Sequence, residues 1–383
     1  EIGVRLVGSE MCIRDRIRGM KTILRTFVGC TAILFGTACM GAVKYVPENM
    51  KVELSLKVPG NNAVNYKLHP DKLENSYFDY EWRSDNKLPI TVFHKVEERD
   101  SCMRLTVQLT AAQDVYFNYR QLLSTGYRHD NCQFYMPGFW YRRNLRSPKK
   151  APSFHTSDSW LVREDRLSAP LTGIFSEKEK RFMTVNRLDD FSMDALATHK
   201  EGEIILSGKT SLGFTGFENQ QGIAMLSFGF PYREAPKSYI RKLTLAPEVE
   251  AFQLMKKGES VLLTWEIMES GADDFSDFIQ HTWEHCYDTY APKPVENSYS
   301  IADMKQVLSC FFVNSLVDNQ PLVYNSGIHL KVSDCERNGQ AEVGFIGRVL
   351  LNAFNAWEYG WQSNREELKV NSTKTVSYTH LRA

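Results

Sequence analysis

The sequence has no excess of charge of either sign. Its 46 Lys and Arg residues equal its 46 Asp and Glu residues, so the formal net charge is zero. Domains that bind nucleic-acid phosphates usually carry a basic excess. The sequence also lacks a Walker loop, a dinucleotide-binding fingerprint and a Gly-x-Ser-x-Gly elbow. These absences argue against a nucleic-acid partner and leave no motif for nucleotide binding or an α/β-hydrolase nucleophile.

Cysteine is sparse and scattered. Three of the eight cysteines lie within the first 42 residues, and the other five are Cys102, Cys132, Cys286, Cys310 and Cys335. They form no Cys-x-x-Cys pair, and their number is odd. The pattern does not predict a disulfide framework, and we expect most of these residues to be buried thiols.

The apolar run from Phe27 to Ala42 is shorter than the ~20 residues that a transmembrane helix needs. It follows Met20, Lys21 and Arg25, which is the layout of a secretory signal over residues 20–42. Cys39 loosely resembles the cysteine of a lipobox, so a lipid anchor at Cys39 is an open alternative. We therefore expect an exported protein, in the periplasm or at the outer-membrane surface.

Both ends carry unpatterned octets. "SEMCIRDR" (residues 9–16) and "VSYTHLRA" (residues 376–383) resemble conceptual translations of sequencing-adapter DNA. A signal peptide works from the N-terminus, so residues 1–19 should not precede one. Because both octets also resemble adapter translations, we interpret residues 1–19 and 376–383 as artefact. On this interpretation the chain is a fragment. We expect its catalytic residues to lie beyond residue 375, and we expect the fragment itself to lack activity.

Residues 43–270 show the pattern of β-strands. "KVELSLKV" (residues 51–58) and "RLTVQL" (residues 104–109) alternate apolar and polar side chains. Further strand candidates follow, and turn signals such as "KKGE" (residues 256–259) separate them. This succession predicts a large antiparallel β-sandwich over residues 43–270.

Residues 271–375 change to a helical period. "ADDFSDFIQHTWEHCYDTY" (residues 272–290) places Phe275, Phe278, Ile279 and Trp283 on one apolar stripe. A Ser-x-x-Asp start signal at residue 300 predicts a second helix. Residues 343–362 read as a third helix, and a fourth begins after residue 364. We predict the start of a helical domain over residues 271–375.

The densest chemical stretch runs from residue 134 to residue 170. Arginine forks bind carboxylates, and Trp and Tyr faces stack on rings. We predict a glycan site lined or bordered by Trp140, Tyr141, Arg142, Arg143, Trp160, Arg163, Asp165 and Arg166. The alternative is a structural loop whose arginines pair with Glu164, Asp165 and other acids. The 12% aromatic content fits either a sugar-binding protein or a β-rich core.

"HTWEH" (residues 281–285) matches the His-x-x-Glu-His signature of zinc peptidases. His281 and His285 would be ligands, Glu284 the general base, and Glu342 or Glu358 a third ligand. Helix histidines without a metal fit the same letters. We predict no metal at His281 and His285 and no cofactor, and we name Glu342 as the one weak candidate for a catalytic residue.

Three stretches resemble the six-hairpin glycosidase superfamily of secreted polysaccharide-degrading enzymes of gut Bacteroidetes: "MPGFWYRRN", "SDSWLVREDRLSAP" and "GFIGRVLLNAFNAWEYG". The resemblance covers most of residues 43–375 at the level of architecture. It implies an N-terminal supersandwich followed by an (α/α)6 toroid, of which this chain holds the first hairpins. It also implies a glycoside hydrolase that acts on a complex polysaccharide or oligosaccharide, of which uronate-containing glycans are one class.

Three other functions stay open. A polysaccharide lyase has the same two-domain plan, and it needs a base and a group that neutralises a uronate carboxylate. A non-catalytic, glycan-binding surface lipoprotein would use the same aromatic and basic residues. The His-x-x-Glu-His zinc peptidase is the third.

Overall fold

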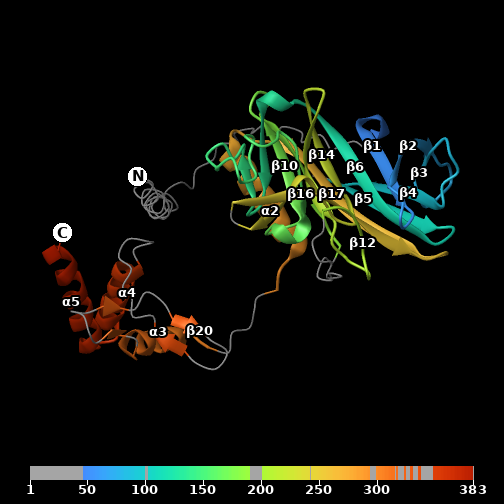
Figure 1. Cartoon of the computed structure of the whole chain (residues 1–383). Helices are drawn as coiled ribbons and strands as arrows, with labels where there is room; N and C mark the ends of the chain where they lie inside the picture. The colour runs from blue at the N-terminus through green and yellow to red at the C-terminus, as the bar shows by residue number, and fades with distance from the viewer. Residues whose placement is uncertain are drawn as a thin grey trace, which may run out of the picture. The chain divides into compact units, whose positions relative to one another are not determined.

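The computed structural model describes residues 46–99, 102–189, 201–241, 243–293, 299–314 and 348–382, together with four short strands between residues 316 and 337. The chain divides into two compact units, Glu1–Ala291 and Pro292–Ala383. Figure 1 shows the first unit as a body of strands and the second as mainly helical. The proposed signal segment, the proposed N-terminal artefact and Glu342 lie outside the described residues.

Seventeen strands of the first unit form one connected hydrogen-bonded set. The first nine are β1 (Met50–Lys57), β2 (Val64–Lys72), β3 (Tyr80–Arg83), β4 (Ile90–Glu98), β5 (Cys102–Ala111), β6 (Val115–Arg128), β7 (Cys132–Met136), β8 (Trp140–Arg142) and β9 (Trp160–Arg163). The other eight are β10 (Leu171–Ser176), β11 (Arg181–Arg187), β12 (Gly202–Ile205), β13 (Phe214–Gln220), β14 (Ile223–Phe230), β15 (Arg233–Arg241), β16 (Thr244–Met255) and β17 (Ser260–Gly271).

Fourteen of the strands fall into two runs that are joined through β2, and the other three, β12, β15 and β16, connect to the first run through β9 and β6. One run has the neighbour order β9-β13-β14-β6-β1-β2, and the other has the order β8-β7-β10-β11-β17-β5-β4-β3-β2. The first half of β2 pairs with β1, and its second half pairs with β3. The predicted sandwich is therefore found in part, because the strands form one continuous set rather than two separate sheets.

Side chains from the two runs meet in a shared core. The rings of Tyr119 on β6 and Trp265 on β17 lie 6.5 Å apart, and those of Phe134 on β7 and Phe217 on β13 lie 4.0 Å apart. All four side chains are buried. Burial of this apolar surface is the main favourable contribution to folding of the first unit.

The predicted alternation along the strands is confirmed. On β5, Leu105, Val107 and Leu109 are fully buried while the residues between them are partly exposed. The predicted turn at residues 256–259 is also present, with Gly258 at φ 81°, a conformation that favours glycine.

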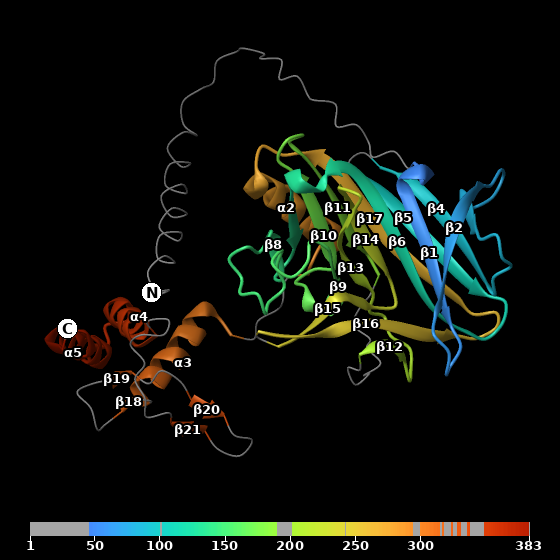
Figure 2. The same cartoon turned by 45° about the horizontal axis from the view of Figure 1, so that its top comes forward.

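Helix α2 (Phe275–Tyr290) packs against the strands. The side chain of Asp274 caps its N-terminus by accepting from the amides of Ser276 and Asp277. Phe278 is fully buried between Phe175 of β10 and Phe182 of β11. Figure 2 shows α2 beside these two strands. The sequence assigned residues 272–290 to a helical domain, but this helix belongs to the first unit.

The second unit contains α3 (Ile301–Asn314), α4 (Arg348–Gln362) and α5 (Glu366–Arg382). Its short strands are β18 (Leu316–Val317), β19 (Val323–Tyr324), β20 (Ile328–Leu330) and β21 (Cys335–Arg337). The predicted start of α3 is confirmed, because Ser300 and Asp303 exchange hydrogen bonds. The described residues contain four α-helices in all and do not show the toroid that the resemblance implies.

None of the helices in the described part of the chain has both the length and the apolar character needed to cross a membrane.

Candidate functional site: a surface formed by β8 and α2

Two of the predicted site residues, Trp140 and Trp160, lie in the core. Both are fully buried, and their rings are 5.8 Å apart. The indole nitrogen of Trp140 donates to the carbonyl of Arg142, and that of Trp160 donates to the carbonyl of Ser157. Neither ring has a solvent-exposed face in this structure, so neither is open to stacking on a sugar, and the prediction that Trp140 and Trp160 line or border a glycan site stays a prediction.

Three of the predicted arginines have partners within the protein. Arg143 donates to backbone carbonyls at residues 129, 130 and 132. Arg163 is buried and forms a bidentate pair with Asp165, with Nη2 and Oδ2 2.6 Å apart. Arg166 pairs with the buried carboxylate of Glu234. The structure thus matches the alternative reading for these residues, in which the arginines of the loop pair internally.

Tyr141 and Arg142 are exposed and, unlike the exposed Asp165, which pairs with Arg163, neither side chain forms an ion pair within the described part of the chain. Tyr141 is 49% exposed, and its ring lies 5.5 Å from that of the buried Tyr135. The guanidinium of Arg142 lies 5.0 Å from the ring centre of Phe275 on α2. No ion pair joins Arg142 to an acidic side chain among the described residues. These two side chains therefore remain available to a ligand.

The backbone holds Arg142 in an uncommon conformation. Its φ of 58° lies in the left-handed region, which costs an ordinary residue about 1 kcal/mol. Asn144 supports the turn: its side-chain oxygen accepts from the amide of Tyr141 at 3.0 Å, and its amide donates to the carbonyl of Tyr141 at 3.1 Å. The loop thereby fixes the direction in which the Arg142 side chain projects from the backbone.

Trp283 of α2 completes this surface. Its indole nitrogen donates to the hydroxyl of Tyr135 at 2.5 Å, which brings it beside the loop that carries Tyr141. Trp283 is 41% exposed, and Tyr287, one helical turn further, is 66% exposed. Burial raises the pKa of Tyr135 to about 12, against the effect of the Trp283 donor, so the phenol stays neutral.

We call Tyr141, Arg142, Trp283 and Tyr287 the β8–α2 surface. Sequence reasoning found Tyr141 and Arg142 but placed Trp283 on the core-facing stripe of the helix. The available signal was its position: Trp283 follows Phe275 by eight residues, which places it about 80° around the helix from Phe275. It therefore lies at the margin of the buried stripe.

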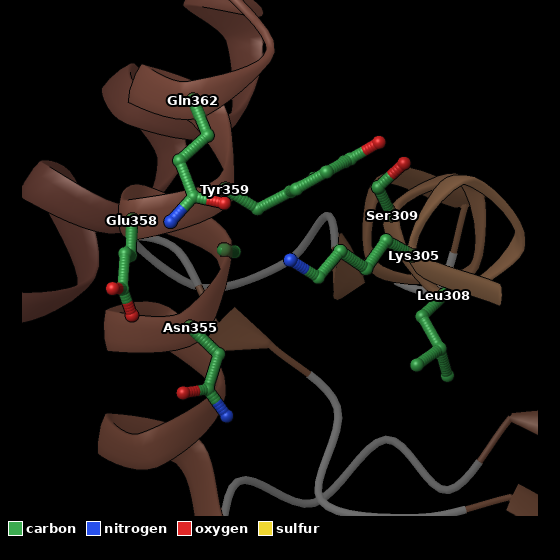
Figure 3. Close-up of a pocket in the computed structure, with 8 residues that line it drawn as sticks. Lys305, Leu308, Ser309, Asn355, Glu358, Tyr359 and Gln362 are labelled. Carbon is green, nitrogen blue, oxygen red and sulfur yellow. The ribbon is translucent and has the colours of Figure 1, made fainter. Parts of the chain in front are cut away.

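A second concavity lies within the helical unit, between α3 and α4. It has a volume of about 300 Å³ and is lined by Lys305, Leu308, Ser309, Asn355, Ala356, Glu358, Tyr359 and Gln362. Figure 3 shows Lys305 extending from α3 towards α4, which contributes Asn355, Glu358 and Gln362. Although most of these side chains are polar, most of the surface that lines the pocket is apolar.

The two histidines of the His-x-x-Glu-His motif have different partners. His281 Nε2 lies 3.5 Å from Asp277 one turn earlier in the helix, whereas His285 Nε2 lies 2.6 Å from Glu266 on β17. Burial opposes ionisation of Glu266, but hydrogen bonds from His285 and Thr289 outweigh it and lower the pKa of Glu266 to about 2. The two imidazoles do not share an acceptor, which is not the arrangement expected of the peptidase motif.

No protein-family profile matches the sequence, and the search of curated proteins found no match. Among solved structures, a polysaccharide lyase is 11% identical over 85% of this chain and 52% of its own, with a TM-score of 0.30. A galactose mutarotase related enzyme from Lactobacillus acidophilus is 11% identical over 57% of this chain and 79% of its own, with a TM-score of 0.30. A putative kojibiose phosphorylase from the human microbiome is 5% identical over 70% of this chain and 28% of its own, with a TM-score of 0.24. These three weak neighbours are carbohydrate-active proteins.

Proposed function

We propose that this chain is part of an exported glycoside hydrolase that acts on a complex, uronate-containing glycan, and that the β8–α2 surface contacts that glycan. The observation that carries the proposal is the exposure of Tyr141, Arg142 and Trp283 around one buried tyrosine. Large aromatic side chains normally lie inside a protein, so exposed ones beside a fixed arginine mark a binding surface.

The chemistry of this surface suits an acidic sugar. Aromatic faces pack against the apolar faces of pyranose rings, and a planar guanidinium binds a carboxylate through two parallel hydrogen bonds. Arg142 can offer that fork because its guanidinium rests on Phe275 rather than in an ion pair with a described carboxylate. The arginine also gives the surface a preference for uronates over neutral sugars.

Calorimetric titration with uronate-containing and neutral oligosaccharides of equal length tests the binding step. Arg142→Asn is the informative variant, because Asn tolerates the left-handed conformation while it removes the guanidinium group. We expect it to weaken uronate binding about tenfold or more, the equivalent of about 1.4 kcal/mol, with little change for the neutral sugar. Arg128→Asn is the matched control, since Arg128 is an exposed arginine paired with Asp130. Equal affinities of wild type and Arg142→Asn for the uronate would contradict the proposal.

A panel of polysaccharides separates the possible reactions. A hydrolase releases new reducing ends, whereas a lyase also produces an unsaturated uronate that absorbs ultraviolet light. A non-catalytic glycan-binding lipoprotein would bind through the same surface and release neither product.

A further inference from the structure

Three side chains with metal-ligating atoms meet where α2 crosses the sheet. Cys102 lies at the start of β5, Glu266 lies in the middle of β17 and His285 lies in α2. Their ligand atoms all lie within 4.8 Å of one another, and the described residues contain no other such group of three. Residues far apart in the sequence therefore supply one sulfur, one nitrogen and one carboxylate oxygen to the same small volume.

The strand register explains how Cys102 and Glu266 come together. Cys102 pairs with Met268, and Glu266 pairs with Arg104, so Cys102 and Glu266 are diagonal neighbours on adjacent strands. Diagonal side chains on one face of an antiparallel pair lie within reach of each other. α2 packs over this face and brings His285 Nε2 to 2.6 Å from Glu266 Oε1.

The site is enclosed by protein on most sides. Cys102 and Glu266 are buried, and the side chain of His285 is 21% exposed. Arg104 approaches the second carboxylate oxygen, with Nη2 and Oε2 3.6 Å apart. Thr289 donates its hydroxyl to Glu266 Oε1 at 3.2 Å, and an outer hydrogen-bonding partner of this kind is usual for a carboxylate that ligates a metal, because it orients the ligand.

We propose that Cys102, Glu266 and His285 bind one zinc ion that joins α2 to the sheet. Zinc accepts thiolate, imidazole and carboxylate ligands in a tetrahedral arrangement, and a water molecule would take the fourth position. Binding releases the thiol proton of Cys102, so a thiolate, a carboxylate and a neutral imidazole balance the two positive charges of the ion. A site without net charge is the form that a buried position accommodates at least cost.

This site is distinct from the one that the His-x-x-Glu-His motif suggests. His281 is directed towards Asp277 and does not belong to the group. The expectation from the sequence that His285 binds no metal rested on its helix neighbours alone. It could not include Cys102 and Glu266, which approach only through the pairing of β5 with β17 and the packing of α2.

Metal content and cobalt spectroscopy on the purified chain test the proposal. After treatment with a chelator and titration with zinc, we expect one tightly bound ion per chain by elemental analysis. Replacement by Co²⁺ should give a thiolate-to-cobalt charge-transfer band in the near ultraviolet. Cys102→Ala should abolish that band and reduce the affinity for zinc by about 100-fold or more.

Matched variants make the result specific. Cys286→Ala removes a buried thiol of α2 that lies outside the group of three, and His281→Ala removes the other histidine of the motif. Both variants should therefore keep the charge-transfer band and the affinity for zinc. Absence of the band in the wild-type chain overturns the proposal whether or not any variant folds. Loss of zinc in His281→Ala to the same extent as in Cys102→Ala also overturns it and would favour the peptidase motif.

Discussion

The attachment of α2 to the sheet depends on Phe278, and its replacement by alanine tests the packing of the first unit. Phe278 is fully buried, with ring centres of Phe182 at 4.9 Å, Phe275 at 5.6 Å and Phe175 at 5.9 Å. The fit is close: a Cβ added at Gly173 would lie 2.5 Å from the Phe278 ring. Phe278→Ala therefore leaves a cavity that rigid strand residues surround.

The expected loss follows from the buried area. An aromatic side chain that buries about 150 Å² contributes about 4 kcal/mol at about 25 cal/mol per Å². Measured Phe→Ala substitutions in cores cost about 3–5 kcal/mol, which agrees with that value. We expect Phe278→Ala to lower the free energy of unfolding of the first unit by this amount.

Guanidinium denaturation followed by tryptophan fluorescence measures the effect, since the buried Trp140, Trp160 and Trp265 all lie in the first unit. Tyr287→Ala is the control, because Tyr287 is an exposed aromatic of the same helix. Its replacement should change stability by less than about 0.5 kcal/mol. A loss below about 1 kcal/mol in Phe278→Ala would show that α2 does not unfold together with the strands, and the assignment of this helix to the first unit would be refuted.

Two further predictions concern the strands. Burial lowers the pKa of His94 to about 3, so its neutral form stabilises the fold fully above pH 6.5, and this contribution declines as the pH falls from 6.5 towards 3. In denaturant titrations between pH 6.5 and pH 5, the wild type should lose about 2 kcal/mol more of its free energy of unfolding than His94→Gln. Parallel losses in the two proteins would contradict the burial of an uncharged His94. Gly216→Ala should destabilise the first unit by about 2–3 kcal/mol, because its new Cβ would lie 2.0 Å from the carbonyl oxygen of Trp160. Gly271→Ala is the control and should change the melting temperature little, because the nearest atom to its new Cβ lies at 3.7 Å. Similar melting temperatures for both variants would show that β13 can move away from β9 at low cost.

Local features of the fold could be predicted from the sequence because neighbouring residues determine them. The alternation in β5 follows from the two-residue period of a strand whose one face is buried. The exchange of hydrogen bonds between Ser300 and Asp303 spans three residues and needs no tertiary contact. The connection of both runs through β2 could not be predicted, because it depends on which strands pair, and pairing involves residues far apart in the chain.

The unit to which α2 belongs was missed for a related reason. The period of residues 272–290 correctly predicted an amphipathic helix with Phe275 and Phe278 on its buried side. An apolar stripe identifies the face that a helix buries but not the element that covers it. The partners Phe175 and Phe182 come from β10 and β11, and the sequence contains no sign of that contact.

The predicted glycan loop shows why residue types alone did not separate core from surface. Trp140, Tyr141, Arg142 and Arg143 are consecutive, yet the first and last are satisfied by backbone carbonyls while the middle two face solvent. Indole and guanidinium groups donate hydrogen bonds equally well to a carbonyl of the protein and to an oxygen of a sugar. A donor is available to a sugar only where no carbonyl of the protein already accepts its hydrogen bond. For Arg143, acceptance by such carbonyls follows from the antiparallel pairing of β8 with β7, in which Arg142 lies opposite Phe134 and the chain continues towards the carbonyls at residues 129–132. The left-handed conformation of Arg142 and the hydrogen bonds between Asn144 and Tyr141 hold the exposed pair, so a variant that straightens this turn should disturb the stability of the loop and the binding surface together.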